Sequence, residues 1–210
     1  MDRMADEMTP GERLEAALEM WEDGMAIMRA NLRRRMPGAS ADEIEVRDAR
    51  LVAADEGILL DADFAFELTA RLEEALDKGV PLYFVTEFEL VRPRWYWLDE
   101  RVASAARSTR LSFHALTRTY RLTTGALHQS FVTLDDALRA LSTVRSWQVL
   151  AKDALKPDTG YVAYVRMRLD TAQLPKPFQV SALANRDWTL GGQWRKWTVN
   201  GPVEQAEAQR

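Results

Sequence analysis

Two pairs of carboxylates have a spacing that could support acid–base chemistry. Asp61 and Asp63 are two residues apart, and so are Glu87 and Glu89. Each pair falls in a run where apolar and polar residues alternate, which predicts a strand whose alternate side chains share a face. Two acids on one face could serve glycoside hydrolysis or bind a cation. A hydrolase or glycan-binding enzyme is therefore an alternative function, although alternation also explains these acids as the solvent side of half-buried strands.

The chain's two histidines, His114 and His128, do not meet in either geometry that the sequence allows. They flank a predicted hairpin turn at residues 123–125. With a two-residue turn, Arg121 faces His128 and His114 projects from the opposite face. With a three-residue turn, Tyr120 faces His128 and the two imidazoles stand about 20 Å apart. We expect His114 in or near the core and His128 at the surface.

Other reactive chemistry is also missing from the sequence. The chain contains no cysteine, which excludes disulfides, thiolate metal sites and cysteine nucleophiles. It contains neither a phosphate-binding loop nor a GxGxxG motif. We predict no catalytic residue, no metal and no cofactor.

Arginines and aromatic residues are interleaved between residues 92 and 121. Seven arginines in this window are opposed by only Asp99 and Glu100. Such a surface could bind single-stranded nucleic acid by charge and stacking, or bind acidic protein or anionic lipid head groups. Arginine outnumbers lysine 23 to 5 in the chain, so composition alone produces such a window and we expect no nucleic-acid partner. The predicted binding surface comprises Arg92, Arg94, Trp95, Trp97, Arg118 and Arg121.

Three of the seven tryptophans lie close together near the end of the chain, at Trp188, Trp194 and Trp197. Residues 191–192 are Gly-Gly, which predicts a two-residue hairpin turn between extended segments. That turn places Trp188 opposite Arg195, where a cation–π contact could form. Core packing is the expected role for most of the tryptophans, and an exposed aromatic strip for a peptide or glycan is the alternative.

Residues 1–43 predict an amphipathic helical extension. Thr9, Pro10 and Glu12 form a helix-start signal, and Pro37-Gly38 ends the helix. At residues 40–43 a second start signal is followed by strand-like alternation rather than by a helix, which suggests a junction between segments of different origin. The apolar stripe of the helix consists of Leu14, Leu18, Trp21, Met25, Met28 and Leu32.

The body of the chain, residues 44–199, alternates at period two over most of its length. Strands are predicted over 58–68, from 82 onward, over 110–132, over 161–169 and in two extended stretches, 178–183 and 193–199. Short helices are predicted over 69–78 and 133–145. This pattern predicts a mainly β (α+β) fold, an antiparallel sheet or sandwich with two short packed helices, rather than a parallel nucleotide-binding sheet. Residues 200–210 form a polar tail.

Charge and hydropathy restrict the partners further. The net charge of −4 resides in the first 43 residues, and the body is neutral, which does not suit a binder of polyanions. The longest apolar stretches are shorter than the roughly 20 residues that span a bilayer. The acidic N-terminus does not have the pattern of a secretory signal. Taken without the family resemblance described below, the sequence therefore predicts a cytoplasmic location.

Residues 44 to about 199 resemble a bacterial family, the domain of unknown function 4390. The resemblance rests on IEVRDARLV at 44–52, GVPLYF at 79–84, RPRWYWLDE at 92–100, LSFHALTRTYRLTTGALHQSF at 111–131, LDDALRAL at 134–141 and LPKPFQVSALANRDW at 174–188. It implies no activity, cofactor or catalytic residue. It does imply an exported or membrane-anchored envelope location, and residues 1–43 depart from the family at the position of that signal or anchor.

The function expected from these observations is non-enzymatic. A large sheet with arginine-rich and aromatic strands, and no assembled reactive centre, favours a binding domain for a protein partner at the bacterial cell envelope. The alternatives are the carboxylate-based hydrolase or glycan-binding enzyme and single-stranded nucleic-acid binding through residues 92–121.

Overall fold

The computed structural model describes residues 43–94, 99–184 and 186–201. All of these residues belong to the unit that spans Ser40–Arg210. The predicted N-terminal helix and the junction at 40–42 lie outside the described residues, and so does the tail beyond 201. Among the described residues, no helix has the length and apolar character needed to cross a membrane.

The alternating run at 58–68 forms the centre of a four-stranded sheet. Its strand, β2 (Gly57–Ala65), pairs antiparallel with β1 (Glu43–Ala54) on one side and with β7 (Thr143–Leu150) on the other. The short β9 (Gly191–Gly192) adds to β1 in parallel orientation, so this sheet is mixed and has the order β7-β2-β1-β9.

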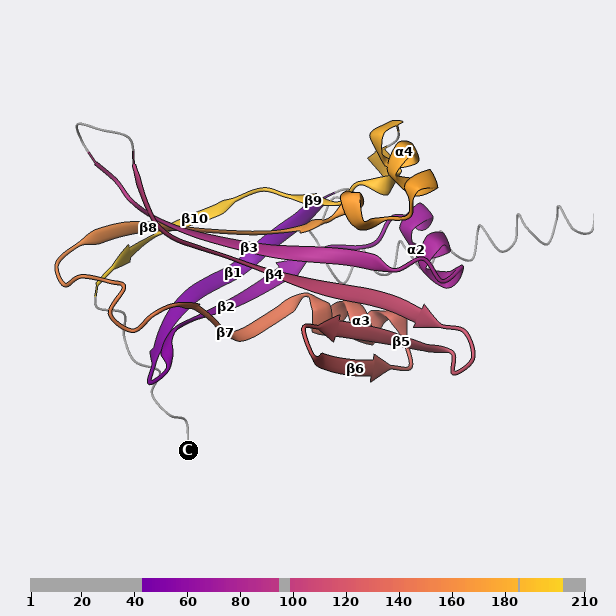
Figure 1. Cartoon of the computed structure of the whole chain (residues 1–210), viewed down its shortest axis with the longest axis horizontal. Helices are drawn as coiled ribbons and strands as arrows, with labels where there is room; N and C mark the ends of the chain where they lie inside the picture. The colour runs from indigo at the N-terminus through magenta and orange to yellow at the C-terminus, as the bar shows by residue number, and fades with distance from the viewer. Residues whose placement is uncertain (1–42, 95–98, 185, 202–210) are drawn as a thin grey trace, which may run out of the picture. The chain divides into compact units, whose positions relative to one another are not determined.

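A six-stranded, entirely antiparallel sheet forms the other layer. Its order is β10-β8-β3-β4-β5-β6. In Figure 1, β3 and β4 form a long hairpin that runs across the molecule, and β1 and β2 cross behind it at an oblique angle. The strands are β3 (Leu82–Arg92), β4 (Glu100–His114), β5 (Thr119–Thr124), β6 (Leu127–Phe131), β8 (Gly160–Leu169) and β10 (Arg195–Asn200).

The facing sides of the two sheets share one hydrophobic core. On β3, the apolar residues that alternate with Glu87 and Glu89 are fully buried. They belong to the same cluster as the buried residues of β2 and β8, which shows that the two layers pack against each other. The glutamates therefore project from the opposite, outer face of the six-stranded sheet. The largest buried core side chains include Leu60, Phe84, Phe88, Leu90, Leu111, Tyr161 and Met167.

Three α-helices are present in the described residues. The first two, α2 (Ala70–Asp77) and α3 (Leu134–Leu141), begin at Thr69 and Thr133, whose hydroxyls accept hydrogen bonds from backbone N–H groups in the first turn. The third, α4 (Lys176–Ala184), lies between the 3₁₀ turns η1 (Thr171–Gln173) and η2 (Arg186–Trp188). In Figure 1, α2 and α4 lie at the same end of the sheets.

The structure corrects several local predictions. Residues 178–183 are helical in α4 rather than extended. The described residues therefore contain three α-helices instead of the two that were predicted for the body. The helix predicted over 133–145 ends at Leu141, because Val144 enters β7 and pairs with Ala62 of β2. Residues 191–192 do not form a hairpin turn, since they pair with β1.

Candidate functional site

A network of ion pairs lies on the outer face of the six-stranded sheet. Glu87 of β3 lies opposite Arg166 of β8, and Arg166 Nε donates a hydrogen bond to Glu87 Oε2 at 2.5 Å. Arg168 Nη2 donates to Glu87 Oε1 at 3.0 Å. Burial raises the pKa of the Glu87 carboxyl, but the hydrogen bonds and charges of Arg168 and Arg166 together outweigh it, and the net pKa lies below the ordinary 4.5. Glu87 is therefore an ionised carboxylate held between two guanidinium groups.

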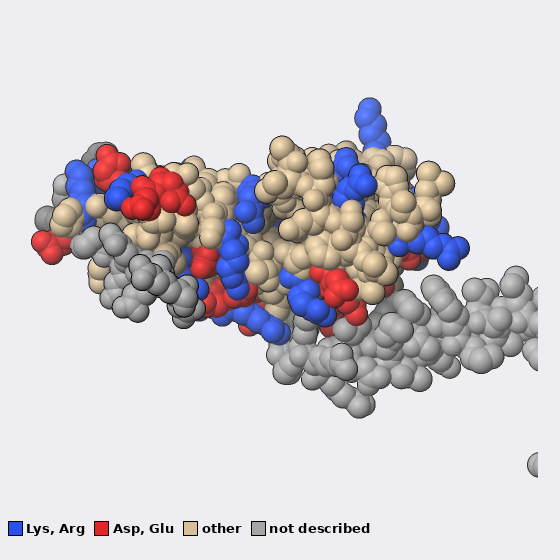
Figure 2. Space-filling view, turned by 90° about the horizontal axis from the view of Figure 1, so that it is seen from below, with Lys and Arg blue, Asp and Glu red and all other residues tan. Residues whose placement is uncertain are grey.

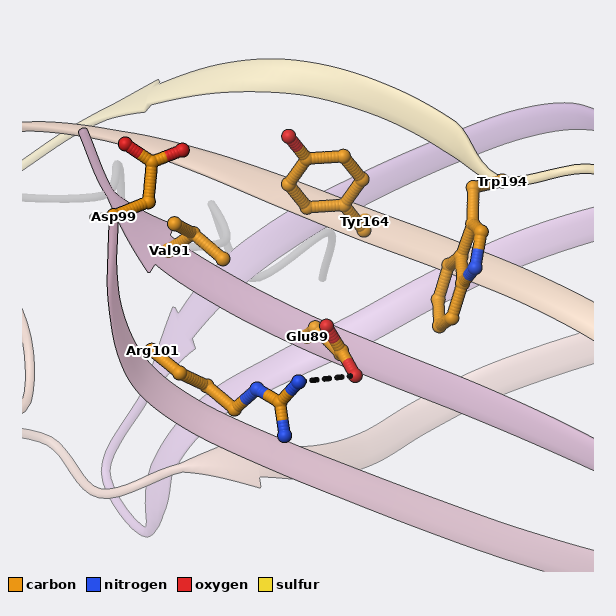
Figure 3. A pocket seen from close by; sticks show the side chains of 6 residues that line it. All are labelled: Glu89, Val91, Asp99, Arg101, Tyr164 and Trp194. Atoms are coloured by element: carbon orange, nitrogen blue, oxygen red, sulfur yellow. Dashed lines mark ion pairs between the residues drawn. The ribbon is translucent and has the colours of Figure 1, made fainter.

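An open cleft lies beside this ion-pair network. We call it the outer cleft; its volume is about 530 Å³ and its walls are Glu89, Val91, Asp99, Arg101, Tyr164 and Trp194. Figure 3 shows Arg101 and Glu89 on its floor, with an ion pair of 3.5 Å between Arg101 Nη2 and Glu89 Oε1. A smaller hollow of about 200 Å³, lined in part by Glu87, shares Glu89 and Trp194 with the outer cleft.

Aromatic rings form one side of the outer cleft. Trp194 stands edge-on to Tyr164, with 6.3 Å between the ring centroids, and 37% of its surface is exposed. Arg166 Cζ lies 4.3 Å from the Trp194 ring centroid, which is a cation–π contact. Figure 3 shows Tyr164 and Trp194 next to each other above Glu89. The cleft thus offers a ligand two aromatic rings together with both signs of charge.

Residues 41–198 match the family model described as domain of unknown function (DUF4390). The chain belongs to the DUF4390 family. A separate match to the Rv0078B-related antitoxin family covers residues 6–55. Neither the curated proteins nor the solved structures include a match to this chain. The family resemblance predicted from the sequence is confirmed, and the separate match at 6–55 agrees with the prediction that residues 1–43 are foreign to that family.

The two predicted acid pairs of the DUF4390 domain lie on different sheets. Asp61 accepts hydrogen bonds from Arg50 (3.2 Å) and from the backbone N–H of Ser146 (2.9 Å). Asp63 pairs with Arg145 at 2.6 Å. Each of the four predicted acids thus has an arginine partner that sequence analysis did not assign to it.

The predicted arginine surface is spread along β4. Arg92 and Arg94 lie where β3 leads into β4, and both pair with Glu100, whose pKa their hydrogen bonds lower. Arg118 lies in the turn after β4, at the other end of a strand of 15 residues, about 50 Å long at 3.4 Å per residue. Trp95 and Trp97 are outside the described residues. The structure therefore brings Arg92 and Arg94 together at Glu100 but separates them from Arg118. Arg121 lies on β5 opposite Ser112.

The positions of the two histidines, His114 and His128, agree only in part with the prediction. Within residues 119–131 the turn of the β5–β6 hairpin is Gly125-Ala126, so His128 faces Thr123 rather than Arg121 or Tyr120. His128 is exposed as expected, but His114 is exposed as well, because it ends β4 at the rim of the sheet. No group of three or more potential metal ligands occurs in the part of the chain that the structure describes.

The predicted contact between Trp188 and Arg195 is not formed. Trp188 packs against Phe178 of α4, with 5.0 Å between ring centroids. Arg195 instead hydrogen-bonds to backbone carbonyls of β1. Trp194 does form a cation–π pair, with Arg166. That pair was not predicted, because it requires the long-range pairing of β8 and β10.

Proposed function

We propose that this DUF4390 domain is a non-enzymatic binding domain that recognises a polypeptide partner in the outer cleft. The observation that carries the proposal is the combination of Trp194 and Tyr164 with the ion pair of Arg101 and Glu89. Aromatic rings and arginine are the side chains most often found at the energetic centre of protein interfaces. The family resemblance suggests an envelope location, so a protein of the cell envelope is the proposed class of partner.

The state of the carboxylates supports binding over acid–base catalysis. A general acid of a glycoside hydrolase needs a raised pKa so that it is protonated near neutral pH. The pKa of Glu87 is lowered, and Glu87 and Glu89 are each held by arginine. Both acids line the smaller hollow, and each already pairs with an arginine.

The charge balance of the outer face supports a polypeptide over a nucleic acid. Arg101, Arg166 and Arg168 each pair with a glutamate, so their charges are largely compensated. A site for single-stranded nucleic acid instead presents uncompensated cations along the phosphate path. A peptide with residues of both charge signs and an aromatic or aliphatic anchor fits this cleft better.

The test is selection of random linear peptides on the full-length chain, followed by binding measurements with purified variants. Fluorescence anisotropy with a selected peptide gives Kd for the wild type, for Trp194→Ala and for Arg118→Ala. We expect Trp194→Ala to weaken binding about tenfold or more, because it removes an exposed anchor, and Arg118→Ala to leave Kd unchanged.

Two results would contradict the proposal. If Arg118→Ala weakens peptide binding and Trp194→Ala does not, the arginine surface predicted from the sequence is the binding site. If the chain binds soluble oligosaccharides through Trp194 but selects no peptide, the glycan-binding alternative replaces the polypeptide partner.

A further inference from the structure

Arg107 of β4 lies on the side of the six-stranded sheet that faces the core. It is opposite Thr86 of β3, which is buried, and it is followed two residues later by Thr109 and four residues later by the buried Leu111. A cation on this face needs a compensating partner, because removing a charge from water is costly. Within the described residues, no carboxylate pairs with Arg107.

The guanidinium of Arg107 is only partly compensated. Its Cζ lies 5.3 Å from the ring centroid of Trp147 on β7, a cation–π contact between the two sheets. Its Nε is buried and has no hydrogen-bond partner in the described structure. Burial also lowers the pKa of Arg107. A buried N–H donor without an acceptor is rare in folded proteins and calls for an explanation such as a missing ligand.

Arg107 lines a pocket of about 260 Å³, whose walls come from β4, β5 and β6 of one sheet, from β7 of the other and from the end of α3. We call it the inner pocket. Its second cation, Arg145, is already bound to Asp63 and donates to the carbonyl oxygens of Ala62 and Val144. No acid occurs among the described lining residues, which are Arg107, Thr109, Leu122, Thr124, Leu127, Gln129, Ala140, Leu141, Thr143 and Arg145.

The walls of the inner pocket divide by chemistry. Leu122 and Leu141 are buried apolar residues, and Leu127 of the edge strand β6 stands at the rim with 76% of its surface exposed. The edge strand β6 has the sequence LHQSF, without Lys, Arg, Asp or Glu. On the right of Figure 2, uncharged surface lies between patches of both charge signs. The pocket thus combines an unpaired guanidinium with aliphatic walls that continue toward an uncharged surface.

We propose that the inner pocket binds a small carboxylate with a short apolar body, its carboxylate on Arg107 and its apolar part against Leu122, Leu127 and Leu141. A carboxylate supplies the counter-charge that Arg107 lacks, and charge-assisted hydrogen bonds to arginine are strong and directional. The volume is below the range of sites for drug-sized ligands, which restricts the apolar part that enters the pocket to about the size of a short aliphatic chain.

Two kinds of ligand carry a carboxylate on a short apolar body. One is a free aliphatic acid, and the other is the C-terminus of a peptide that ends in an aliphatic residue. Octanoate below its micelle concentration is the probe for the first, and 1-octanol is its neutral counterpart. A short peptide ending in leucine, with a free or an amidated C-terminus, probes the second. Binding to the full-length chain is measured by calorimetry and by the tryptophan fluorescence that Trp147 contributes.

We expect at least one carboxylate probe to bind clearly more tightly than its neutral counterpart. Arg107→Gln should weaken that binding about tenfold or more, while leaving any binding of the neutral counterpart unchanged. Arg118→Gln, an exposed arginine in the turn after β4, is the matched control and should bind as the wild type does. The source is the free acid if octanoate binds, and a polypeptide C-terminus if only the free-acid peptide does.

Leu127→Asp keeps the test decisive if Arg107→Gln does not fold. Leu127 is exposed, so the substitution leaves the core intact and places a negative charge at the rim. Both probes lose an apolar contact, but only the carboxylate is also repelled, so its binding should weaken clearly more than that of its neutral counterpart. The proposal is overturned if neither carboxylate binds, if acid and neutral probes bind equally, or if Leu127→Asp and Arg107→Gln both bind the acid as the wild type does.

Discussion

Arg195 of β10 donates a hydrogen bond from Nη1 to the carbonyl oxygen of Val46 in β1, at 2.9 Å, and so connects the two sheets. The same nitrogen lies 2.5 Å from the carbonyl oxygen of Arg47. Both carbonyls belong to an irregularity in β1, where the register with β2 shifts between Val46 and Asp48. The bulge frees acceptors from the ladder, and the arginine satisfies them from the opposite layer.

Replacing Arg195 by methionine should therefore destabilise the domain. We expect a loss of about 1–3 kcal/mol in the free energy of unfolding, because a charged donor is removed from two backbone acceptors. Urea denaturation followed by circular dichroism measures it. Lys196→Met is the control, since the adjacent lysine is exposed and faces the other side of β10, and a similar loss in both variants would contradict the assigned role of Arg195.

Two neighbouring glycines allow a sharp test of how β9 closes the four-stranded sheet. A Cβ atom at Gly192 would collide with the carbonyl oxygen of Met167 and come within 2.9 Å of that of Ile44, whereas one at Gly191 would meet nothing within 4 Å. We expect Gly192→Ala to cost about 1–3 kcal/mol through overpacking, and Gly191→Ala less than about 0.5 kcal/mol. Thermal or urea unfolding distinguishes them, and equal stabilities would show that β9 does not approach β1 and β8 as described.

The ion pairs of Glu87 predict a specific pH dependence. Its pKa is lowered in the folded state, so the ionised carboxylate stabilises the fold above its unfolded pKa, near 4.5, and this contribution is lost as pH falls through the folded pKa. Glu87→Gln should thus cost about 1–3 kcal/mol near neutral pH, and the difference from wild type should shrink as the pH drops below 4.5.

Urea unfolding of both proteins over a range of pH values measures that difference. Glu45→Gln replaces an exposed glutamate of β1 and should change stability by less than about 0.5 kcal/mol at neutral pH. A difference between wild type and Glu87→Gln that stays constant down to acidic pH would mean that the carboxylate charge contributes nothing to the fold.

Local patterns were sufficient to predict the strands and helices whose signal is contained in a few neighbouring residues. The alternation at 161–169 became β8, and that at 58–68 became β2, which ends at Ala65 rather than at residue 68. Thr69 and Thr133 cap α2 and α3. These elements were predictable because burial of one strand face and satisfaction of free N–H groups are both local requirements.

Long-range pairing explains what was not predicted. The Gly-Gly sequence at 191–192 favours a tight turn, yet here the absence of side chains serves a close approach to Met167 and Ile44. The helical period through Val144 is interrupted because the carbonyl of Ser142 accepts a hydrogen bond from the backbone of Phe64, and the chain then joins β2.

The candidate site was predictable only as separate residues for the same reason. Glu87 and Glu89 could be placed on the outer side of one strand from their spacing. The arginine partners of Glu87 could not, because the register that sets it opposite Arg166 joins segments about 80 residues apart. The partner of Glu89, Arg101, lies across the β3–β4 hairpin, beyond a register shift that the sequence pattern did not predict. The outer cleft therefore follows from sheet topology rather than from any motif.

Thr69 provides a final test, because its hydroxyl joins a helix start to a distant segment. Its Oγ1 accepts a hydrogen bond from Leu72 N at 3.3 Å and donates to the carbonyl oxygen of Asp187 in η2 at 2.5 Å. Thr133 caps α3 in the same way, but its hydroxyl donates only within the same turn, to Asp136. Thr69→Val should therefore cost about 2–3 kcal/mol, the sum of a lost cap and a lost tertiary hydrogen bond, and Thr133→Val about 1 kcal/mol. Urea unfolding measures both, and faster limited proteolysis at α4 and η2 in Thr69→Val alone would show that the bond to Asp187 holds that segment. Equal losses of unfolding free energy in the two variants would mean that Thr69 acts only as a helix cap.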